Sequence, residues 1–160
     1  DNLTPQEARF RLGRLIVRIA DGQVRLSALP LSGLEILYGA LIRVLAPERV
    51  VRSLPTSANE GLCRRLRRTM PPDGARRARE LIYDVLAEDS DPLQDLKDVR
   101  VGMDRTANQG GMILSGSPGV VLSVLSGGGT AAEWRASPDA VAMMSFLTSS
   151  EFLALQGRLR

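Results

Sequence analysis

Residues 4–22 read TPQEARFRLGRLIVRIADG, and this stretch carries the signals of an α-helix at both of its ends. Thr4 is a preferred N-cap residue, Pro5 suits the first helical position, and Glu7 completes the spacing of a capping box. Gly22 is typical of the position just beyond a helix C-terminus. Between these ends, apolar residues recur at helical spacing, at Ala8, Leu12, Leu15, Ile16 and Ile19. The pattern predicts an amphipathic helix.

Similar signals divide the rest of the chain. Ser32 with Glu35 and Ser57 with Glu60 have the spacing of further capping boxes. Other predicted helix starts are Asp73, Asp91–Pro92, Ser117–Pro118, Ser137–Pro138, and Ser149 or Ser150, with one further turn at 130–136. The longest helix is expected from Leu93 to Ser115, and the pair Gly110–Gly111 inside it predicts a close contact with another helix. No segment alternates apolar and polar residues as a strand does. We therefore expect an all-α fold, a single domain over residues 1–160 with about seven or eight helices and no sheet.

The composition fits an ordinary folded domain with an aliphatic core. The 160 residues are 44% hydrophobic, 24% charged and only 4% aromatic. The single cysteine, Cys63, excludes a disulfide within the chain, so a reducing, cytoplasmic location is expected. No apolar run is long enough for a transmembrane helix, and residues 1–5 do not resemble a signal peptide. The missing initiator Met indicates a fragment of a longer chain.

The chain contains no histidine, which removes the usual base for a nucleophilic serine or cysteine and the commonest zinc ligand. The Gly-rich segment 126–130 lacks the spacing of a phosphate-binding loop and is predicted to be a flexible loop. An enzyme that uses carboxylates alone stays open, for example Asp104 with Glu80 or Glu133, but no spacing supports a particular pair. We expect no catalytic residues, no cofactor and no metal.

The strongest concentration of positive charge is a cluster at Arg64, Arg65, Arg67 and Arg68. Such a cluster can bind phosphates or an acidic partner, whereas the plainer interpretation is a solvated helix face. No aromatic residue interleaves with these arginines to stack on bases. A net charge of +3 is mild, so nucleic-acid binding is weakly supported.

Two segments resemble the zinc-site helices of M48-type metallopeptidases, which carry Leu-Gly-His-Glu-x-x-His on one helix and Glu-x-x-Ala-Asp on another. Residues 12–18 read LGRLIVR, with Arg14 and Arg18 at the histidine positions and leucine at that of the catalytic glutamate. Residues 104–108 read DRTAN, with Asp104 at the position of the third ligand. Arginine offers zinc no lone pair. The resemblance therefore implies a domain without metal or catalysis, in which Arg14, Arg18 and Asp104 form an ion-pair network.

The wider pattern resembles C-terminal regions of large tetratricopeptide-repeat proteins from myxobacteria and their relatives. The shared features are Phe10-x-Leu12-Gly13-Arg14, the apolar helix at 34–45, the Gly-rich apolar helix that follows Asp104, and FLTSSEFLAL at 146–155. This resemblance implies a non-catalytic interaction or assembly module whose partner is another protein or other domains of the same chain. The alternative is a nucleic-acid or phosphate-binding module that uses Arg64–Arg68. An interaction module should expose a contiguous apolar patch.

Overall fold

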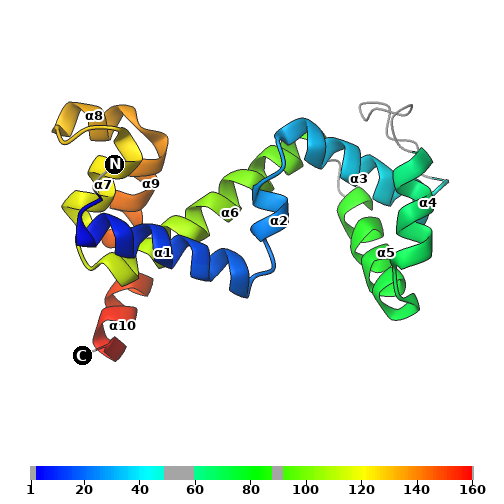
Figure 1. Cartoon of the computed structure of the whole chain (residues 1–160), viewed down its shortest axis with the longest axis horizontal. Helices are drawn as coiled ribbons and strands as arrows, with labels where there is room; N and C mark the ends of the chain where they lie inside the picture. Colours follow the sequence, from blue (N-terminus) through cyan, green and yellow to red (C-terminus); the bar gives the residue numbers. More distant parts are fainter. Residues whose placement is uncertain (1–2, 49–59, 88–91, 160) are drawn as a thin grey trace. The chain divides into compact units, whose positions relative to one another are not determined.

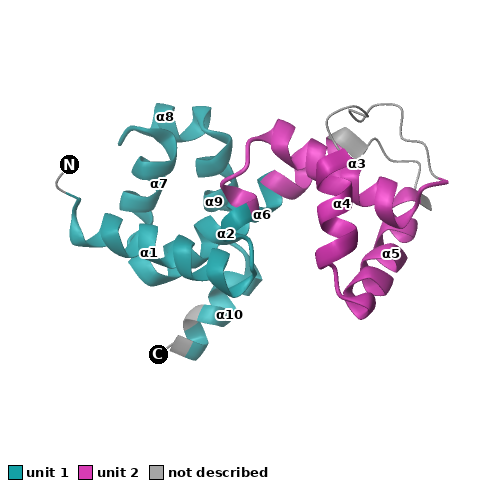
Figure 2. Ribbon diagram, turned by 45° about the vertical axis from the view of Figure 1, so that its right-hand side comes forward, with its two compact units in different colours: residues 1–25, 101–160 teal, residues 26–100 magenta. Residues whose placement is uncertain are grey.

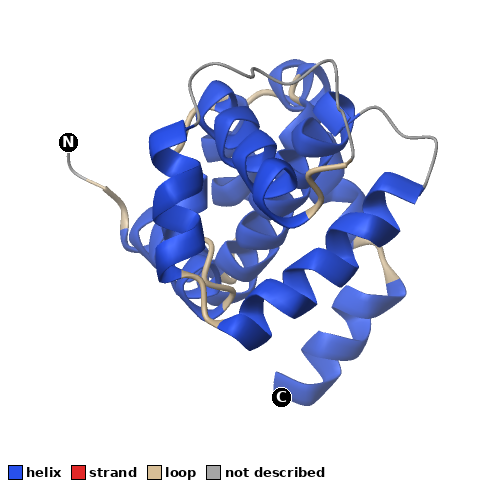
Figure 3. Cartoon of the chain, turned by 90° about the vertical axis from the view of Figure 1, so that its right-hand side faces the viewer, coloured by secondary structure: helices blue, strands red, loops and turns tan. Residues whose placement is uncertain are grey.

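The structure is a computed structural model that describes residues 3–48, 60–87 and 92–159. Within these residues every regular element is an α-helix and there is no strand (Figures 1 and 3). The ten helices are α1 (Pro5–Ala20), α2 (Val24–Ser27), α3 (Leu31–Leu45), α4 (Glu60–Thr69), α5 (Pro72–Ala87), α6 (Pro92–Ser115), α7 (Pro118–Ser126), α8 (Ala131–Ala136), α9 (Pro138–Leu147) and α10 (Ser150–Leu159). The predicted all-α fold is confirmed. The number of described helices exceeds the predicted seven or eight because α2 forms between the first two predicted helices and α8 forms at the expected single turn.

The helices group into two compact units (Figure 2). Unit 1 comprises residues 1–25 and 101–160, and unit 2 comprises residues 26–100. Residues 92–100 of the long helix α6 belong to unit 2, and residues 101–115 belong to unit 1. The single domain over residues 1–160 stays a prediction.

The core of unit 1 is aliphatic with a few aromatic rings. Helix α7 packs against α1, α8 and α9, and α10 packs against α9. The buried side chains of this core are Phe10, Met112, Val121, Leu122, Ala140, Met143 and Phe152. The ring of Phe152 meets that of Phe146 edge to face, with 5.2 Å between their centroids. This core holds α1, α6 and α9 in the positions that the site below requires.

Unit 2 has a smaller core, formed where α3 packs against α4 and α5. Its buried residues are Ile42, Leu45, Ala46 and Ile82, with partly buried side chains such as Tyr38 and Met70 packed around them. Cys63 of α4 is also buried, and its thiol faces the carbonyl oxygen of Ala40 at 3.8 Å. Its burial against α3 fits the expected reduced, unbridged state.

Several predicted helix ends agree with the structure. Thr4 and Glu7 form the predicted capping box, and Thr130 and Glu133 form another that was not predicted. The hydroxyl of Ser137 caps α9 by accepting from the backbone of Ala140. The stop at Gly22 is supported by its φ of 67°, a conformation that favours glycine.

Two predicted caps are wrong, because each of these helices begins two residues earlier, beside a proline. Helix α3 begins at Leu31 with Pro30 as its N-cap and no side-chain hydrogen bond, so Ser32 lies inside the first turn. Helix α5 begins at Pro72, which places Asp73 inside the helix as well. A fixed proline φ defines these starts without a capping hydroxyl. Ser57 and Asp91 lie outside the described residues.

The Gly-rich segment 126–130 joins α7 to α8. Ser126 ends α7, and Gly127 adopts the left-handed conformation with φ of 72°. The carbonyl oxygen of Gly128 accepts hydrogen bonds from the Ser126 hydroxyl at 2.6 Å and from the Trp134 indole at 3.1 Å. The flexibility of this loop stays a prediction. The two hydrogen bonds restrain the segment at Gly128.

None of the described helices combines the length and the apolar character needed to cross a bilayer.

Candidate functional site

Helices α1 and α6 approach closely in unit 1 because glycines face each other at their contact. A Cβ atom at Gly13 would lie 2.8 Å from both the Cα of Gly111 and the carbonyl oxygen of Gly110. A Cβ at Gly111 would lie 2.7 Å from the carbonyl oxygen of Phe10. Real Cβ atoms do not approach this closely, so only glycine permits the packing. The close approach brings polar side chains of the two helices within ion-pair distance.

The structure brings together Arg14, Arg18 and Asp104, the three residues predicted to form an ion-pair network. Arg18 donates a hydrogen bond from Nη2 to Oδ1 of Asp104 at 2.5 Å. Nη2 of Arg14 lies 3.9 Å from the same oxygen. The three side chains are 23%, 29% and 31% exposed, for Arg18, Arg14 and Asp104 respectively. The network thus joins α1 to α6 at a partly buried position.

The charges of this network are unequal, since two guanidinium groups share the carboxylate of Asp104. Burial lowers the pKa of Arg14 most, and repulsion from Arg18 lowers it further. The carboxylates of Asp104 and Asp139 oppose this shift. The guanidinium of Arg14 also lies over the ring of Phe10, 5.7 Å from the centroid. Arg14 therefore interacts more weakly with Asp104 than Arg18, which forms the direct hydrogen bond to that carboxylate.

The residues at this position do not fit a zinc ion. Catalytic zinc needs about three protein ligands with available lone pairs. Arg14 and Arg18 have none, and their positive charge repels a cation. Among residues 3–48, 60–87 and 92–159, no group of three His, Cys, Asp or Glu side chains could hold a metal. We therefore derive no metal chemistry for this site.

Asn108 is a buried polar residue on α6, four residues beyond Asp104, whose burial was not predicted. It is 2% exposed, and its Oδ1 atom has no hydrogen-bond partner among the described residues. It lines a small pocket together with Arg105, Gln109 and Asp139. The signal available in the sequence was the position of Asn108 two residues before the Gly110–Gly111 pair, which predicted a close helix contact.

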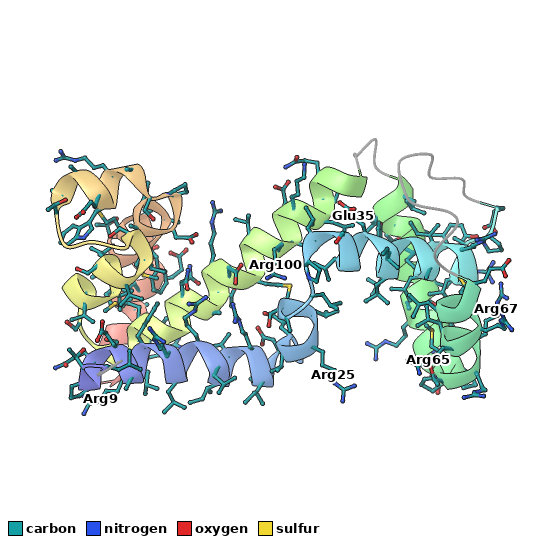
Figure 4. All side chains as sticks on the ribbon, turned by 45° about the horizontal axis from the view of Figure 1, so that its top comes forward. Arg9, Arg25, Glu35, Arg65, Arg67 and Arg100 are labelled. Carbon is teal, nitrogen blue, oxygen red and sulfur yellow. The ribbon has the colours of Figure 1, made fainter. Side chains whose placement is uncertain are left out.

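The apolar side of α1 faces away from the core of unit 1. We call Leu12, Leu15, Ile16 and Ile19 the α1 stripe; they are 51%, 46%, 50% and 60% exposed, respectively. The buried residues of the same helix are Phe10 and Gly13, on the opposite side. In Figure 4, side chains without nitrogen or oxygen project from the lower edge of α1. The amphipathic pattern was predicted, but it is the other side of the helix that packs.

The four arginines of the predicted cluster are all exposed on α4, but only two of them share a pocket. Arg64 and Arg67 line an open pocket together with Arg43 of α3. Arg65 and Arg68 are not part of its lining. Arg64 and Arg67 are three residues apart and therefore share a face of α4.

The carboxylates considered for acid–base chemistry have local partners instead. Glu80 accepts a hydrogen bond from Arg76 at 3.3 Å on the surface of α5. The carboxylate of Glu133 accepts from the hydroxyl and the backbone N–H of Thr130 in the capping box of α8. Asp104 is engaged by Arg18. These contacts give each carboxylate a structural role.

Comparison with known proteins adds no family to these observations. The resemblances to zinc metallopeptidases and to tetratricopeptide-repeat proteins stay predictions from the sequence. No family model, no curated protein and no solved structure matches this chain.

Proposed function

We propose that this chain is a non-catalytic interaction module that binds a protein partner through the α1 stripe. The observation that carries the proposal is the exposure of four aliphatic side chains at Leu12, Leu15, Ile16 and Ile19. Their spacing places them in one row along a single helix face. Burying an aliphatic side chain of this size contributes about 1.5–3 kcal/mol when the burial is complete. Because these side chains are about half exposed, about half of that free energy can still be gained when a partner covers them.

The arrangement of α1 supports a binding role over a simple surface helix. Its opposite side is already anchored by Phe10 and by the glycine contact with α6. The helix is therefore held in place before a partner binds, which lowers the entropy that binding must overcome. A row of aliphatic residues at helical spacing is the pattern that helices use to fill apolar grooves. The α1 stripe accordingly fits a groove on a helical protein or on other domains of the parent chain.

The charges beside the stripe indicate the chemistry of the partner. Arg9 and Arg11 are exposed on α1, on the two sides of the stripe, and Arg9 projects below the helix in Figure 4. The acidic residue of the first turn, Glu7, is engaged by Thr4. We expect an apolar groove with an acidic rim, since opposite charges favour association.

A double variant of the stripe tests the proposal. Leu15→Gln with Ile16→Gln removes apolar surface from side chains that are about half exposed, so folding should persist. The matched control is Leu81→Gln with Val85→Gln on α5, where both side chains are exposed and lie on one helix face. Proteins captured from native lysate are identified by mass spectrometry, and one of them is purified for direct titration. Purified partner should bind the unmodified chain and the control equally, and the stripe variant at least about ten-fold more weakly.

Three outcomes would overturn this proposal. Equal binding of the partner to the stripe variant and the control would show that α1 is not the contact. A concentration-dependent dimer in sedimentation, lost only in the stripe variant, would assign the stripe to a second copy. Stripe-dependent binding to vesicles that contain anionic lipid would assign it to a membrane surface.

The absence of catalysis is part of the same proposal, and the guanidinium groups at Arg14 and Arg18 support it. Atomic absorption on the purified chain should find no stoichiometric zinc. Stoichiometric zinc, or peptide cleavage that a chelator abolishes, would contradict this part without affecting the α1 stripe.

A further inference from the structure

A second surface feature lies in unit 2, where α3 packs against α4. An open pocket of about 590 Å³ is lined by Arg43 of α3 and by Glu60, Cys63, Arg64 and Arg67 of α4. The thiol of Cys63, which is also part of the lining, is buried and lies 3.8 Å from the carbonyl oxygen of Ala40 on α3, where the two helices pack together. Arginines from two different helices are thereby directed to one space.

The pocket carries excess positive charge, and two of its arginines form no ion pair within the described part of the chain. Arg64 and Arg67 are exposed and form no ion pair within 4.0 Å among the described residues, Glu60 included. Among the described lining residues, three arginines and one glutamate give a formal charge of +2. Guanidinium groups present planar pairs of N–H donors that match the oxygens of phosphate. A phosphate monoester carries about −1.5 to −2 charge at pH 7, which balances this lining better than a single carboxylate.

We infer that the pocket lined by Arg43, Arg64 and Arg67 binds a phosphate monoester group. This site is separate from the α1 stripe and does not depend on the function proposed for it. Nucleic acid is the less favoured ligand, because Arg65 and Arg68 lie outside the pocket lining and α4 has no aromatic side chain to stack on a base. The monoester can come from a phosphorylated small molecule or from a phosphorylated protein side chain, since both present the same group.

Two double variants that each remove two positive charges from α4 distinguish binding in the pocket from general attraction of an anion to a basic helix. Arg64→Ala with Arg67→Ala removes pocket arginines, and Arg65→Ala with Arg68→Ala removes two from the same helix outside the lining. Calorimetric titration of the full chain uses inorganic phosphate, a phosphoserine peptide with its unphosphorylated form, and a single-stranded oligonucleotide. The pocket variant should lose at least about ten-fold in affinity for the bound monoester, and the control less than about three-fold. Circular dichroism checks that both variants stay helical.

Glu60→Gln provides a change in the opposite direction. Removing the one negative charge of the lining should strengthen binding of the same probe about two- to five-fold. Binding of free phosphate as well as the peptide identifies a small-molecule source, and binding of the phosphopeptide alone identifies a phosphoprotein; either supports the inference. Equal losses in the two double variants, tighter binding of the oligonucleotide than of any monoester, or no binding of any probe at millimolar concentration would each overturn it.

Discussion

Arg18 of α1 donates a hydrogen bond of 2.5 Å to Asp104 of α6, and the guanidinium of Arg14, one helical turn earlier, lies 3.9 Å from the same oxygen. The carboxylate therefore balances two cations at a partly buried contact. Asp104→Ala should lower the free energy of unfolding by about 1–3 kcal/mol, because it leaves two arginines without their shared anion. Arg18→Ala should cost less, and Arg14→Ala least, since it also removes the repulsion and desolvation that lower the pKa of Arg14.

Urea denaturation followed by helical circular dichroism measures this order. Asp98→Ala is the control, because Asp98 is an exposed residue of the same helix that accepts from the side chain of Gln94. Its cost should stay within about 0.5 kcal/mol. If Arg14→Ala proved as destabilising as Asp104→Ala, the unequal roles assigned to the two arginines would be wrong.

The sequence predicted the members of this network but not how they meet. Arg14 and Arg18 fall one turn apart on a helix, which places them on one face by spacing alone. Their distance to Asp104, far along the chain, depends on tertiary packing of α1 against α6. The Gly110–Gly111 pair predicted a close helix contact, yet its partner on α1, Gly13, had no signal beyond being a glycine. Side-chain fit between distant segments is not encoded in local periodicity.

Gly111 and Gly102 offer a matched test of that packing, since both are glycines inside α6. A Cβ at Gly111 would meet the backbone oxygen of Phe10 at 2.7 Å, whereas a Cβ at Gly102 would meet nothing within 4 Å. Gly111→Ala should destabilise by about 1–3 kcal/mol through overpacking. Gly102→Ala should stabilise by about 0.5–1 kcal/mol, because alanine favours the helix. Chemical denaturation of the two variants measures the difference, and a stabilising Gly111→Ala would show that α1 and α6 are not packed this closely.

The α1 stripe shows a second limit of sequence patterns. The row at Leu12, Leu15, Ile16 and Ile19 predicted an amphipathic helix, and such a row ordinarily faces the core. In the structure the buried side carries Phe10 and Gly13 instead. The ring of Phe10 in the core and the close contact at Gly13 determine which side of α1 packs. The spacing of apolar residues carries no information about either of them. The helix was therefore predictable, whereas the surface that it leaves for a partner was not.

The two capping boxes predict how stability responds to acid. The backbone N–H of Thr4, and then its hydroxyl, lower the pKa of Glu7 by hydrogen bonding to its carboxylate. The hydroxyl of Thr130, and then its backbone N–H, lower the pKa of Glu133 in the same way. A carboxyl whose pKa is lower in the folded state stabilises the fold above its unfolded pKa, and this stability is lost as the pH falls through its folded pKa.

Glu7→Gln with Glu133→Gln should therefore melt at a lower temperature than the unmodified chain at pH 7. The gap should begin to narrow as the pH falls below about 5 and should close as the pH passes through the lowered folded pKa of the two glutamates, because they then become neutral like glutamine. Glu35→Gln is the control, because the structure gives α3 no side-chain cap at its start, and it should show no such pH-dependent gap. Thermal melts at half-unit pH steps provide the measurement. A gap that persists unchanged at pH 3 would mean that charge on Glu7 and Glu133 does not stabilise these helix ends, since protonation would then have left the difference intact.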